Sequence, residues 1–269
     1  MRRALVTGAS RGVGRALVTE LAARGLEVVA AARRAGDLAG LAAAERLQLD
    51  VTSDASVAAA AELAGPVDLL VNNAAISAAA TVEDTPAGVA LAMFNTNVAG
   101  PLRMISAFVP GMRERGSGTV VNVSSAAGQA VFPLNGLHAA SKHALEALSE
   151  ALAMEAGPLG IRVLVVQLGG VDTGMYQNQE RYVSSAYAHL HRAQQESFED
   201  ARAHGSSPEQ VARAIADAIA DTGRPLRVPI GNDAAWILAE RARLDDTAWI
   251  ARVRELTPAT SNGAVDHDQ

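Results

Sequence analysis

Short apolar segments alternate along most of this chain with longer, alanine-rich segments of helical periodicity. Such alternation is typical of a parallel β-sheet, because each connection between parallel strands must cross back over the sheet and is usually a helix. We therefore predict an α/β fold in which a doubly wound, parallel, seven-stranded sheet carries helices on both faces. In such sheets ligands bind at the carboxyl ends of the strands, so a functional site is expected at that edge.

The predicted elements are short strands and longer helices in alternation. The expected strands are 4–6, 27–31, 47–49, 69–71, 119–123, 163–167 and 226–228. The expected helices are 14–24, 54–63, 89–115, 137–156, 208–221 and 234–243. Neither a repeat nor a linker interrupts this pattern, so residues 1–255 are expected to form one domain. Within it, the polar insert 174–205 is expected to be a lid over the substrate, and 256–269 a disordered tail.

Composition excludes several classes of protein. A formal net charge of −6 argues against a nucleic-acid surface, and the absence of cysteine rules out disulfides and thiolate catalysis. The first glycine turn comes too early for a signal peptide, and no apolar segment reaches membrane-spanning length. These features predict a cytoplasmic protein without a nucleic-acid or membrane partner. His189, His191 and His204 could chelate a metal, but residues two apart on a helix point to different faces, so no metal site is expected.

A glycine-rich turn joins the first expected strand to the first expected helix. It reads Thr-Gly-Ala-Ser-Arg-Gly-Val-Gly over residues 7–14. Glycines at such a turn allow backbone N–H groups and the positive end of the helix to approach a pyrophosphate closely. Glycines also make tight turns for steric reasons alone, but this position favours a dinucleotide. The residues expected to contact it are Gly8, Ser10, Arg11, Gly12, Val13 and Gly14.

Lys142 is the only lysine in the chain, against 22 arginines. A composition that uses arginine almost everywhere has kept one lysine, which indicates that this position needs an ammonium group. The two cations differ, since an ammonium is a compact point charge whose pKa responds to its surroundings.

Five further motifs follow the glycine turn in order. They are Asp50-Val51, Asn72-Asn73-Ala74-Ala75, Asn97-Val98-Ala99-Gly100, Asn122-Val123-Ser124-Ser125-Ala126-Ala127-Gly128 and Val171-Asp172-Thr173. Together with the turn, they resemble the classical short-chain dehydrogenase/reductase family over about residues 1–231. The resemblance implies a Rossmann-type fold and a nicotinamide dinucleotide cofactor. It places that cofactor against the glycine turn and against Asp50, Val51, Asn73, Ala74, Lys142, Val171 and Thr173.

The resemblance also implies catalytic roles. Ser125, 13 residues before position 138, matches the serine that positions the substrate oxygen, and Asn97 matches the asparagine that helps to hold a proton-relay water. Lys142 matches the lysine that holds the nicotinamide ribose and lowers the pKa of a catalytic tyrosine. In the family that tyrosine stands four residues before the lysine, and here the position is His138. All three tyrosines lie after residue 175, so no shift of register supplies one.

Histidine can perform this chemistry by other means. The pKa of imidazole, near 6.5, lies below that of phenol, near 10, and the Lys142 ammonium should lower the pKa of His138 further. A neutral imidazole can polarise a carbonyl through its N–H group, and an imidazolium is a general acid. Geometry is less favourable, because imidazole is shorter than phenol and a displacement of about 1 Å can cost roughly a hundredfold in rate.

The choice of dinucleotide depends on the end of the second strand. A carboxylate there would bind a ribose 2′-hydroxyl and repel a 2′-phosphate. The chain instead has Arg33 after this strand and Arg11 in the glycine turn. Both could be solvated surface arginines, but two guanidinium groups near one ribose suit a phosphate, so NADP(H) is the expected cofactor.

A second departure from the family follows the sixth strand, where Leu168-Gly169-Gly170 replaces the usual Pro-Gly. Three hypotheses stay open. The first is an NADP(H)-dependent oxidoreductase of a carbonyl/alcohol pair. The second is a non-redox enzyme, such as a cyclase, dehydratase, isomerase or epimerase, that uses His138 as its acid or base. The third is a catalytically silent dinucleotide-binding protein.

The substrate and the assembly are indicated only weakly. The segment 94–175 resembles members of the family that act on steroids and polyketides, which favours a bulky, apolar substrate. Tyr176, Tyr182 or Tyr187 of the insert could supply a phenol to the site. The expected helices 89–115 and 137–156 are apolar on several faces, so a homodimer or homotetramer is expected.

Overall fold

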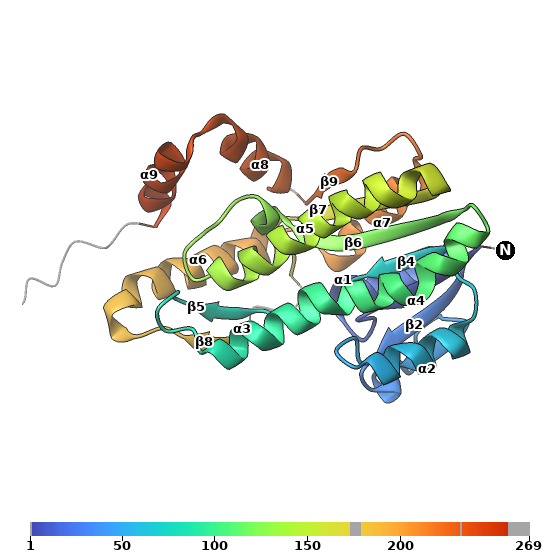
Figure 1. Cartoon of the computed structure of the whole chain (residues 1–269). Helices are drawn as coiled ribbons and strands as arrows, with labels where there is room; N and C mark the ends of the chain where they lie inside the picture. The colour runs from blue at the N-terminus through green and yellow to red at the C-terminus, as the bar shows by residue number, and fades with distance from the viewer. Residues whose placement is uncertain (1, 173–178, 232, 258–269) are drawn as a thin grey trace, which may run out of the picture.

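A computed structural model describes residues 2–172, 179–231 and 233–257 of the chain. Its centre is a seven-stranded parallel sheet with the strand order β3-β2-β1-β4-β6-β7-β9 (Figure 1). The strands are β1 (Arg3–Thr7), β2 (Glu27–Ala32), β3 (Glu45–Gln48), β4 (Leu69–Asn72), β6 (Gly118–Ser125), β7 (Ile161–Leu168) and β9 (Arg227–Ile230). From β1 the chain runs to one edge and then crosses to the other, which creates a switch point between β1 and β4. The predicted doubly wound α/β fold is confirmed.

Helices cover both faces of this sheet, with α1 and α7 on one face and α2, α4 and α5 on the other (Figure 1). The α-helices are α1 (Gly12–Ala23), α2 (Asp54–Ala64), α3 (Ala87–Phe94), α4 (Gly100–Glu114), α5 (Gly136–Ala156), α6 (Ala188–His204), α7 (Pro208–Ala220), α8 (Ala234–Arg243) and α9 (Asp246–Leu256). Short helical turns are η1 (Ala35–Leu38), η2 (Asn95–Ala99), η3 (Ala126–Gly128), η4 (Gly157–Leu159) and η6 (Ser185–Tyr187). No helix within the described residues is long and apolar enough to cross a membrane.

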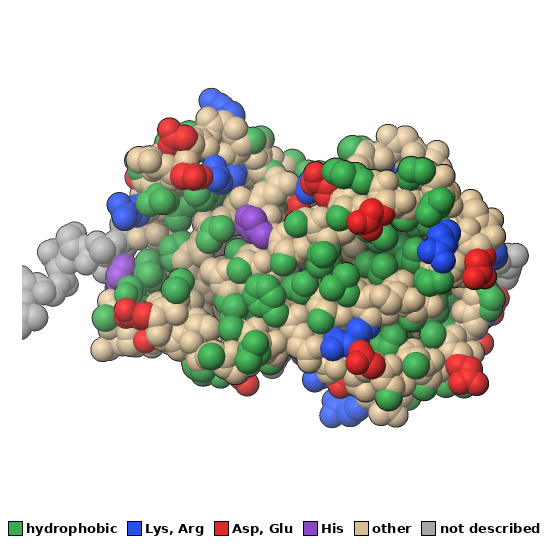
Figure 2. Space-filling view, in the orientation of Figure 1, with side chains coloured by type: hydrophobic (Ala, Val, Ile, Leu, Met, Phe, Trp, Pro, Cys, Tyr) green, Lys and Arg blue, Asp and Glu red, His purple; other side chains and the backbone are tan. Residues whose placement is uncertain are grey.

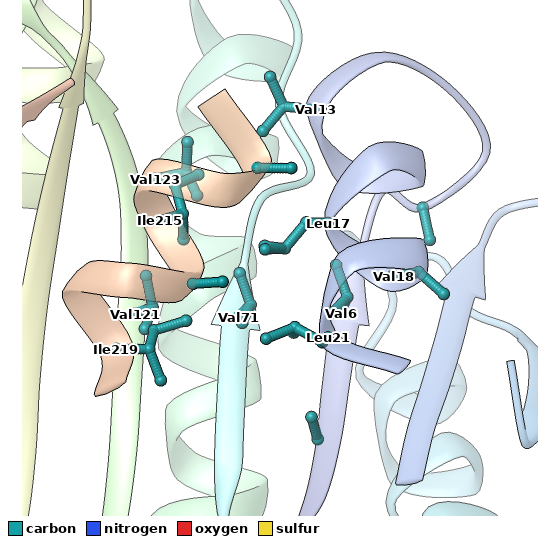
Figure 3. Packing of buried hydrophobic residues seen from close by; sticks show 14 of the residues in the cluster. Val6, Val13, Leu17, Val18, Leu21, Val71, Val121, Val123, Ile215 and Ile219 are labelled. Atoms are coloured by element: carbon teal, nitrogen blue, oxygen red, sulfur yellow. The ribbon is translucent and has the colours of Figure 1, made fainter. Parts of the chain in front are cut away.

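The core consists of two layers that follow from the alternation of strand side chains. On β1, Val6 packs with α1 and α7, whereas Leu5 packs with α2 and α4 on the opposite face. Figure 3 shows Leu17 and Leu21 of α1 and Ile215 of α7 directed toward valines of the central strands. Aliphatic side chains fill the layer under α1 and α7, whereas Met104, Phe108 and Met112 of α4 contribute to the other layer. The packed helices fix the strand ends at which a ligand can bind.

The expected helix 89–115 is a helical run that changes its hydrogen-bonding pattern midway. α3 passes through the π-helical turn η2 into α4 without a break. Pro101 stands at the beginning of α4 and has no N–H group to bond the carbonyl four residues earlier, which is that of Asn97. Residues 95–99 therefore form a π-helical turn instead of a regular α-helical one, and Asn97 lies within it.

The sequence prediction missed a small sheet and a helix. β5 (Ala78–Ala80) pairs in parallel with β8 (Glu180–Tyr182), so the expected lid is attached to the loop after β4. α9 is held by Trp249, whose ring lies edge-on to Phe132 at 5.5 Å and whose indole N–H donates to the carbonyl of Val131. Both features depend on contacts between distant segments, which a local pattern does not indicate.

Candidate active site

A pocket lies at the carboxyl ends of β1, β2, β4 and β6, the edge that the fold predicts. Most residues that the sequence indicated line it, namely Gly8, Ser10, Arg11, Gly12, Val13, Gly14, Arg33, Asp50, Val51, Asn73, Ala74, Ser125, His138, Lys142 and Val171. Asn97 is buried and is not part of this lining. Thr173 lies outside the described residues.

The glycine turn is packed too tightly for side chains. At Gly8, which has a φ of +66°, a Cβ would lie 2.8 Å from the Cα of Ala74. At Gly14, a Cβ would collide with the carbonyl of Gly8 and with the amide of Asn73. The missing Cβ atoms let the loop after β4 lie against the turn, and they keep the beginning of α1 open toward the pocket.

The side chain of Asn73 holds the glycine turn in place through two hydrogen bonds. Its Nδ2 donates to the carbonyls of Thr7 and Gly8, at 2.9 and 3.2 Å. The Oγ1 of Thr7 accepts from the backbone N–H groups of Asn73 and Ala74. The side chain of Asn73 is thus engaged in holding the turn, although the residue also lines the pocket.

One end of the pocket carries two cationic side chains and one carboxylate. Arg11 and Arg33 both line it, and within the described part of the chain neither side chain has a hydrogen bond or an ion pair. Their neighbour Arg34 is different, since its Nε bonds Asp37 at 3.0 Å. Asp50 accepts hydrogen bonds from the N–H and hydroxyl of Thr52, and these bonds lower the pKa of its carboxyl group. Among the described residues of this end, Arg11 and Arg33 are therefore the two cations without an ion pair, and the charge of Arg33 contributes to the lowered pKa of Asp50.

The opposite end of the pocket brings together Ser125, His138 and Lys142. Ser125 ends β6, and its Oγ donates to the carbonyl of Leu168 and accepts from the N–H of Ala127, both at 3.2 Å. His138 and Lys142 lie one turn apart on α5, on a buried face of that helix. The Nζ of Lys142 donates to the carbonyl of Val123 at 2.8 Å.

Burial decides the protonation of the two basic groups. It lowers the pKa of His138 to about 3, and the charge of Lys142 contributes in the same direction, while a hydrogen bond with the backbone of Ile76 opposes them. Burial also lowers the pKa of Lys142, to about 8, against the favourable charge of Glu146. At neutral pH the site therefore contains a neutral imidazole beside an ammonium group. The Nδ1 atom of His138 is buried and has no hydrogen-bond partner among the described residues.

Asn97 positions the loop that faces His138. Its Oδ1 accepts from the N–H of Ile76 at 2.9 Å, and its Nδ2 donates to the carbonyl of Ile76 and to the Oγ of Ser141, both at 3.0 Å. The amide group thus connects η2, the loop after β4 and α5. Both hydrogen bonds that the Nδ2 of Asn97 donates hold these segments together.

The Gly169-Gly170 segment is held by a residue from the C-terminal part of the chain. Both carboxylate oxygens of Asp233 accept from the N–H of Gly170 at 3.0 Å. A Cβ at Gly169 would collide with the same carboxylate. Leu168 stands where the family usually has proline, the extra Gly170 supplies the N–H that Asp233 binds, and Gly169 leaves space for that carboxylate.

The two tyrosines of the insert that the structure describes are half-buried and bond glutamates. The hydroxyl of Tyr182 donates to Glu180 at 2.6 Å, and that of Tyr187 bonds Glu83. Neither tyrosine lines the pocket. Tyr176 lies outside the described residues.

Comparison with known proteins assigns the family. The model of the short chain dehydrogenases matches residues 2–184, which is more than half of the 269-residue chain. The chain belongs to the short-chain dehydrogenase family. It is accordingly an enzyme of the dehydrogenase/reductase class. The uncharacterized oxidoreductase YusZ of Bacillus subtilis is 32% identical to it over 266 residues, with 91% of this chain and 95% of that protein covered.

Solved structures resemble this short-chain dehydrogenase over nearly their full length. A short-chain dehydrogenase from Streptomyces avermitilis has a TM-score of 0.82 and 36% identity, covering 95% of this chain and 99% of that one. A Burkholderia cenocepacia enzyme in complex with NADP has a TM-score of 0.77 and 28% identity, with 94% and 99% covered. A Burkholderia phymatum enzyme in complex with NAD has a TM-score of 0.78 and 27% identity, with 90% and 92% covered. Structures of this kind therefore include complexes with either dinucleotide.

Sequence reasoning missed three residues that shape the site of this short-chain dehydrogenase. They are Ile76, Glu146 and Asp233. Glu146 could have been found, since a charged residue one turn after Lys142 lies on the same buried helix face. Ile76 acts through its backbone N–H and carbonyl groups, and Asp233 acts through its carboxylate from a segment distant in the sequence. No local pattern indicates either residue.

Proposed function

We propose that this enzyme is an NADP(H)-dependent oxidoreductase of a carbonyl/alcohol pair, in which His138 takes the place of the family's tyrosine. One observation carries the proposal: Ser125, His138 and Lys142 converge at one end of a pocket whose other end is a glycine turn. The glycine turn and the guanidinium groups of Arg11 and Arg33 in the pocket lining fit a phosphorylated dinucleotide. Bound NADP(H) would supply or accept the hydride.

The residues of the chain would bind the dinucleotide and manage the proton. Gly8, Gly12 and Gly14 leave room for the pyrophosphate, and Lys142 would hold the nicotinamide ribose. Ser125 would orient the substrate oxygen, and the neutral ring of His138 would hydrogen-bond to it. Because burial keeps His138 neutral, the net proton would come from the Lys142 ammonium, whose pKa of about 8 makes it a ready donor.

The substrate class follows from the reactive end of the pocket. Ile76, Leu168 and Val171 line it there, and Lys142 is the charged group among the described lining residues at this end. An apolar wall with few polar groups favours a bulky, uncharged ketone or alcohol. The insert 174–205 would close over this substrate as a lid, as part of the single domain 1–255.

The decisive experiment follows NADPH absorbance with a panel of bulky ketones and three proteins, wild type, His138→Phe and His138→Tyr. We expect wild type to oxidise NADPH and His138→Phe to lose roughly 10²- to 10⁴-fold in turnover. The turnover of wild type should be constant between about pH 5 and 7, where neither buried group titrates, and should fall above about pH 8 as Lys142 loses its proton. Full activity of His138→Phe would contradict the role of the imidazole.

A second candidate function is favoured by the protonation of His138. A ring with a pKa of about 3 is neutral at neutral pH and has no imidazolium proton to donate there, so the alternative is an enzyme in which His138 accepts a proton as a weak base, without hydride transfer. A cyclase, dehydratase, isomerase or epimerase would then keep NADP as a structural cofactor. Binding of NADPH without consumption by wild type, together with consumption by His138→Tyr, would favour this alternative.

The preference for NADPH is expected to depend on Arg33. Charge-assisted hydrogen bonds contribute roughly 1.5–3 kcal/mol, so Arg33→Ala should reduce the ratio of NADPH to NADH affinity by about 10- to 100-fold. Arg34→Ala is the matched control, because Arg34 is the adjacent arginine and is already paired with Asp37. Fluorescence titration with both dinucleotides measures the ratio. Equal effects of the two substitutions would contradict a specific phosphate contact.

A homo-oligomer remains part of the proposal. Leu91, Phe94, Leu102 and Met154 are large hydrophobic residues with exposed side chains on α3, α4 and α5. Figure 2 shows hydrophobic side chains gathered over the face formed by α4 and α5. An apolar surface of this kind on two long helices favours association with a second copy of the chain.

A further inference from the structure

A buried carboxylate, that of Glu146, lies behind the reactive end of the pocket. Its side chain is 3% exposed, and its oxygens accept hydrogen bonds from four side chains. The Oγ of Ser124 donates at 2.8 Å, the Nε of Arg227 at 2.9 Å, the Nε2 of Gln167 at 3.1 Å and the Nε2 of Gln129 at 3.4 Å. A buried charge is tolerated when several donors satisfy it, and here the donors come from separate elements.

The position of Glu146 connects these elements to the reactive groups. Ser124 directly precedes Ser125 at the end of β6, and Gln167 lies at the end of β7. Arg227 begins β9, and Glu146 itself lies one turn after Lys142 on α5. A Cβ at Gly128 would collide with Glu146, so the chain after Ser125 also lies against this carboxylate.

We propose that Glu146 is a positioning residue that holds the Ser125 end of β6 and sustains the ammonium form of Lys142. It would not touch substrate or dinucleotide itself. The proposal rests on the proposed function only for the identity of Ser125 and Lys142 as reacting groups. The hydrogen bond between Glu146 and Ser124 supports the role in holding the end of β6. The position of Glu146 one turn after Lys142 on α5 supports the role in keeping Lys142 charged.

Glu146 is the charged group that influences the pKa of Lys142. Burial lowers the pKa of Lys142, and the charge of Glu146 is the interaction that raises it. Two histidines lie near Lys142 on α5. The ring of His138, one turn earlier, is neutral, and the ring of the adjacent His143 bonds the carbonyl of Ala139 at 2.9 Å. Arg227 lies beyond Glu146 on β9. The other elements packed on α5 (α3, β5, β6, β7, η2, η3 and η4) carry no charged residue except Arg162 at the start of β7, which bonds carbonyls at the end of α7.

The chain offers a matched control for Glu146. Glu150 lies one turn further along α5 and pairs with the same Arg227, at 2.6 Å. Its side chain is 44% exposed, and it has no bond to Ser124. Replacing either glutamate with glutamine removes one charge from the same arginine, but only Glu146→Gln removes it from the group that bonds Ser124.

Lys142 can be titrated without an activity assay because it is the only lysine. Incorporation of [ε-¹³C]lysine gives a single lysine resonance, whose shift against pH yields the pKa of Lys142 directly. We expect Glu146→Gln to lower this pKa by roughly one unit, because the substitution removes an opposite charge one turn away on the same buried helix face. Glu150→Gln should leave it within about 0.3 units, and Arg227→Gln should raise it, because the charge of Glu146 is then less neutralised.

The turnover of the same variants tests the positioning of Ser125. Glu146→Gln and Ser124→Ala should each lower kcat about tenfold with little change in the KM of the ketone, and Ser124→Ala should leave the pKa of Lys142 unchanged. An unchanged Lys142 pKa in folded Glu146→Gln, or equal shifts in Glu146→Gln and Glu150→Gln, would overturn the proposal. If Glu146→Gln does not fold, the sign of the Arg227→Gln shift decides instead, and a fall in pKa refutes it. A wild type that reduces no ketone would refute the proposed function and leave the titration result intact.

Discussion

The substitution Lys142→Met is expected to abolish turnover and to make the protein more stable. Removal of one preorganised cationic donor typically lowers kcat by roughly 10²- to 10³-fold, and methionine neither donates a proton nor holds a ribose hydroxyl. Lys142→Arg should be no substitute, because a planar guanidinium does not fit a niche built for a compact ammonium beside the carbonyl of Val123.

The gain in stability follows from the lowered pKa of Lys142. The ordinary value is 10.5 and the folded value is about 8, so below pH 8 the folded protein must keep a charge in a buried place. Keeping this charge buried costs about 3 kcal/mol in the free energy of unfolding. The hydrogen bond from Lys142 to the carbonyl of Val123 offsets roughly 1 kcal/mol of this cost. Lys142→Met should therefore raise the free energy of unfolding by roughly 2 kcal/mol at pH 7.

The pH dependence of this gain is the sharper test. Wild type should become more stable as the pH rises from about 8 to 10.5, because its lysine then folds without a charge. The variant lacks this dependence, so the difference between the two proteins should shrink over the same range. Urea unfolding at several pH values measures both, and a Lys142→Met protein that is less stable than wild type at pH 7 would contradict the buried charge.

The substitution Gly14→Ala is expected to disrupt dinucleotide binding. Its Cβ would collide with the carbonyl of Gly8 and the amide of Asn73, and both groups belong to the framework of the turn. Relief of this clash must move the turn or the loop after β4. A backbone N–H bond to a charged pyrophosphate contributes roughly 1.5–3 kcal/mol, so loss of one such bond should lower the affinity for NADPH by at least about tenfold, and overpacking should destabilise the fold by about 1–3 kcal/mol.

Gly88→Ala is the control for the loss of a glycine. Gly88 lies in α3, and nothing stands within 4 Å of the position that its Cβ would take. Alanine there should leave NADPH binding unchanged and stabilise the helix by roughly 0.5–1 kcal/mol. Fluorescence titration and thermal unfolding of both variants provide the comparison. Wild-type affinity in a folded Gly14→Ala protein would show that the turn does not hold the pyrophosphate.

The limits of sequence reasoning are clearest at α3, η2 and α4. The periodicity of residues 89–115 predicts one helix, and Pro101 stands within it. That a proline here gives a π turn rather than an end to the helix depends on Asn97, whose amide bonds Ile76 and Ser141 from other segments. Residues 180–182 of the insert form strand β8 for a similar reason, because they pair with the distant strand β5.

The sequence by itself determined the fold class, the strand order along the chain, the glycine turn and the position of the single lysine. These features are local, since side-chain periodicity and the steric freedom of glycine act within a few residues. Only the tertiary structure decided that burial is the main cause of the neutral ring of His138, that Asp233 holds Gly170 and that Glu146 bonds Ser124. Protonation and buried polar contacts depend on which distant groups exclude water from a side chain, and that information does not exist until the sheet and its helices have packed.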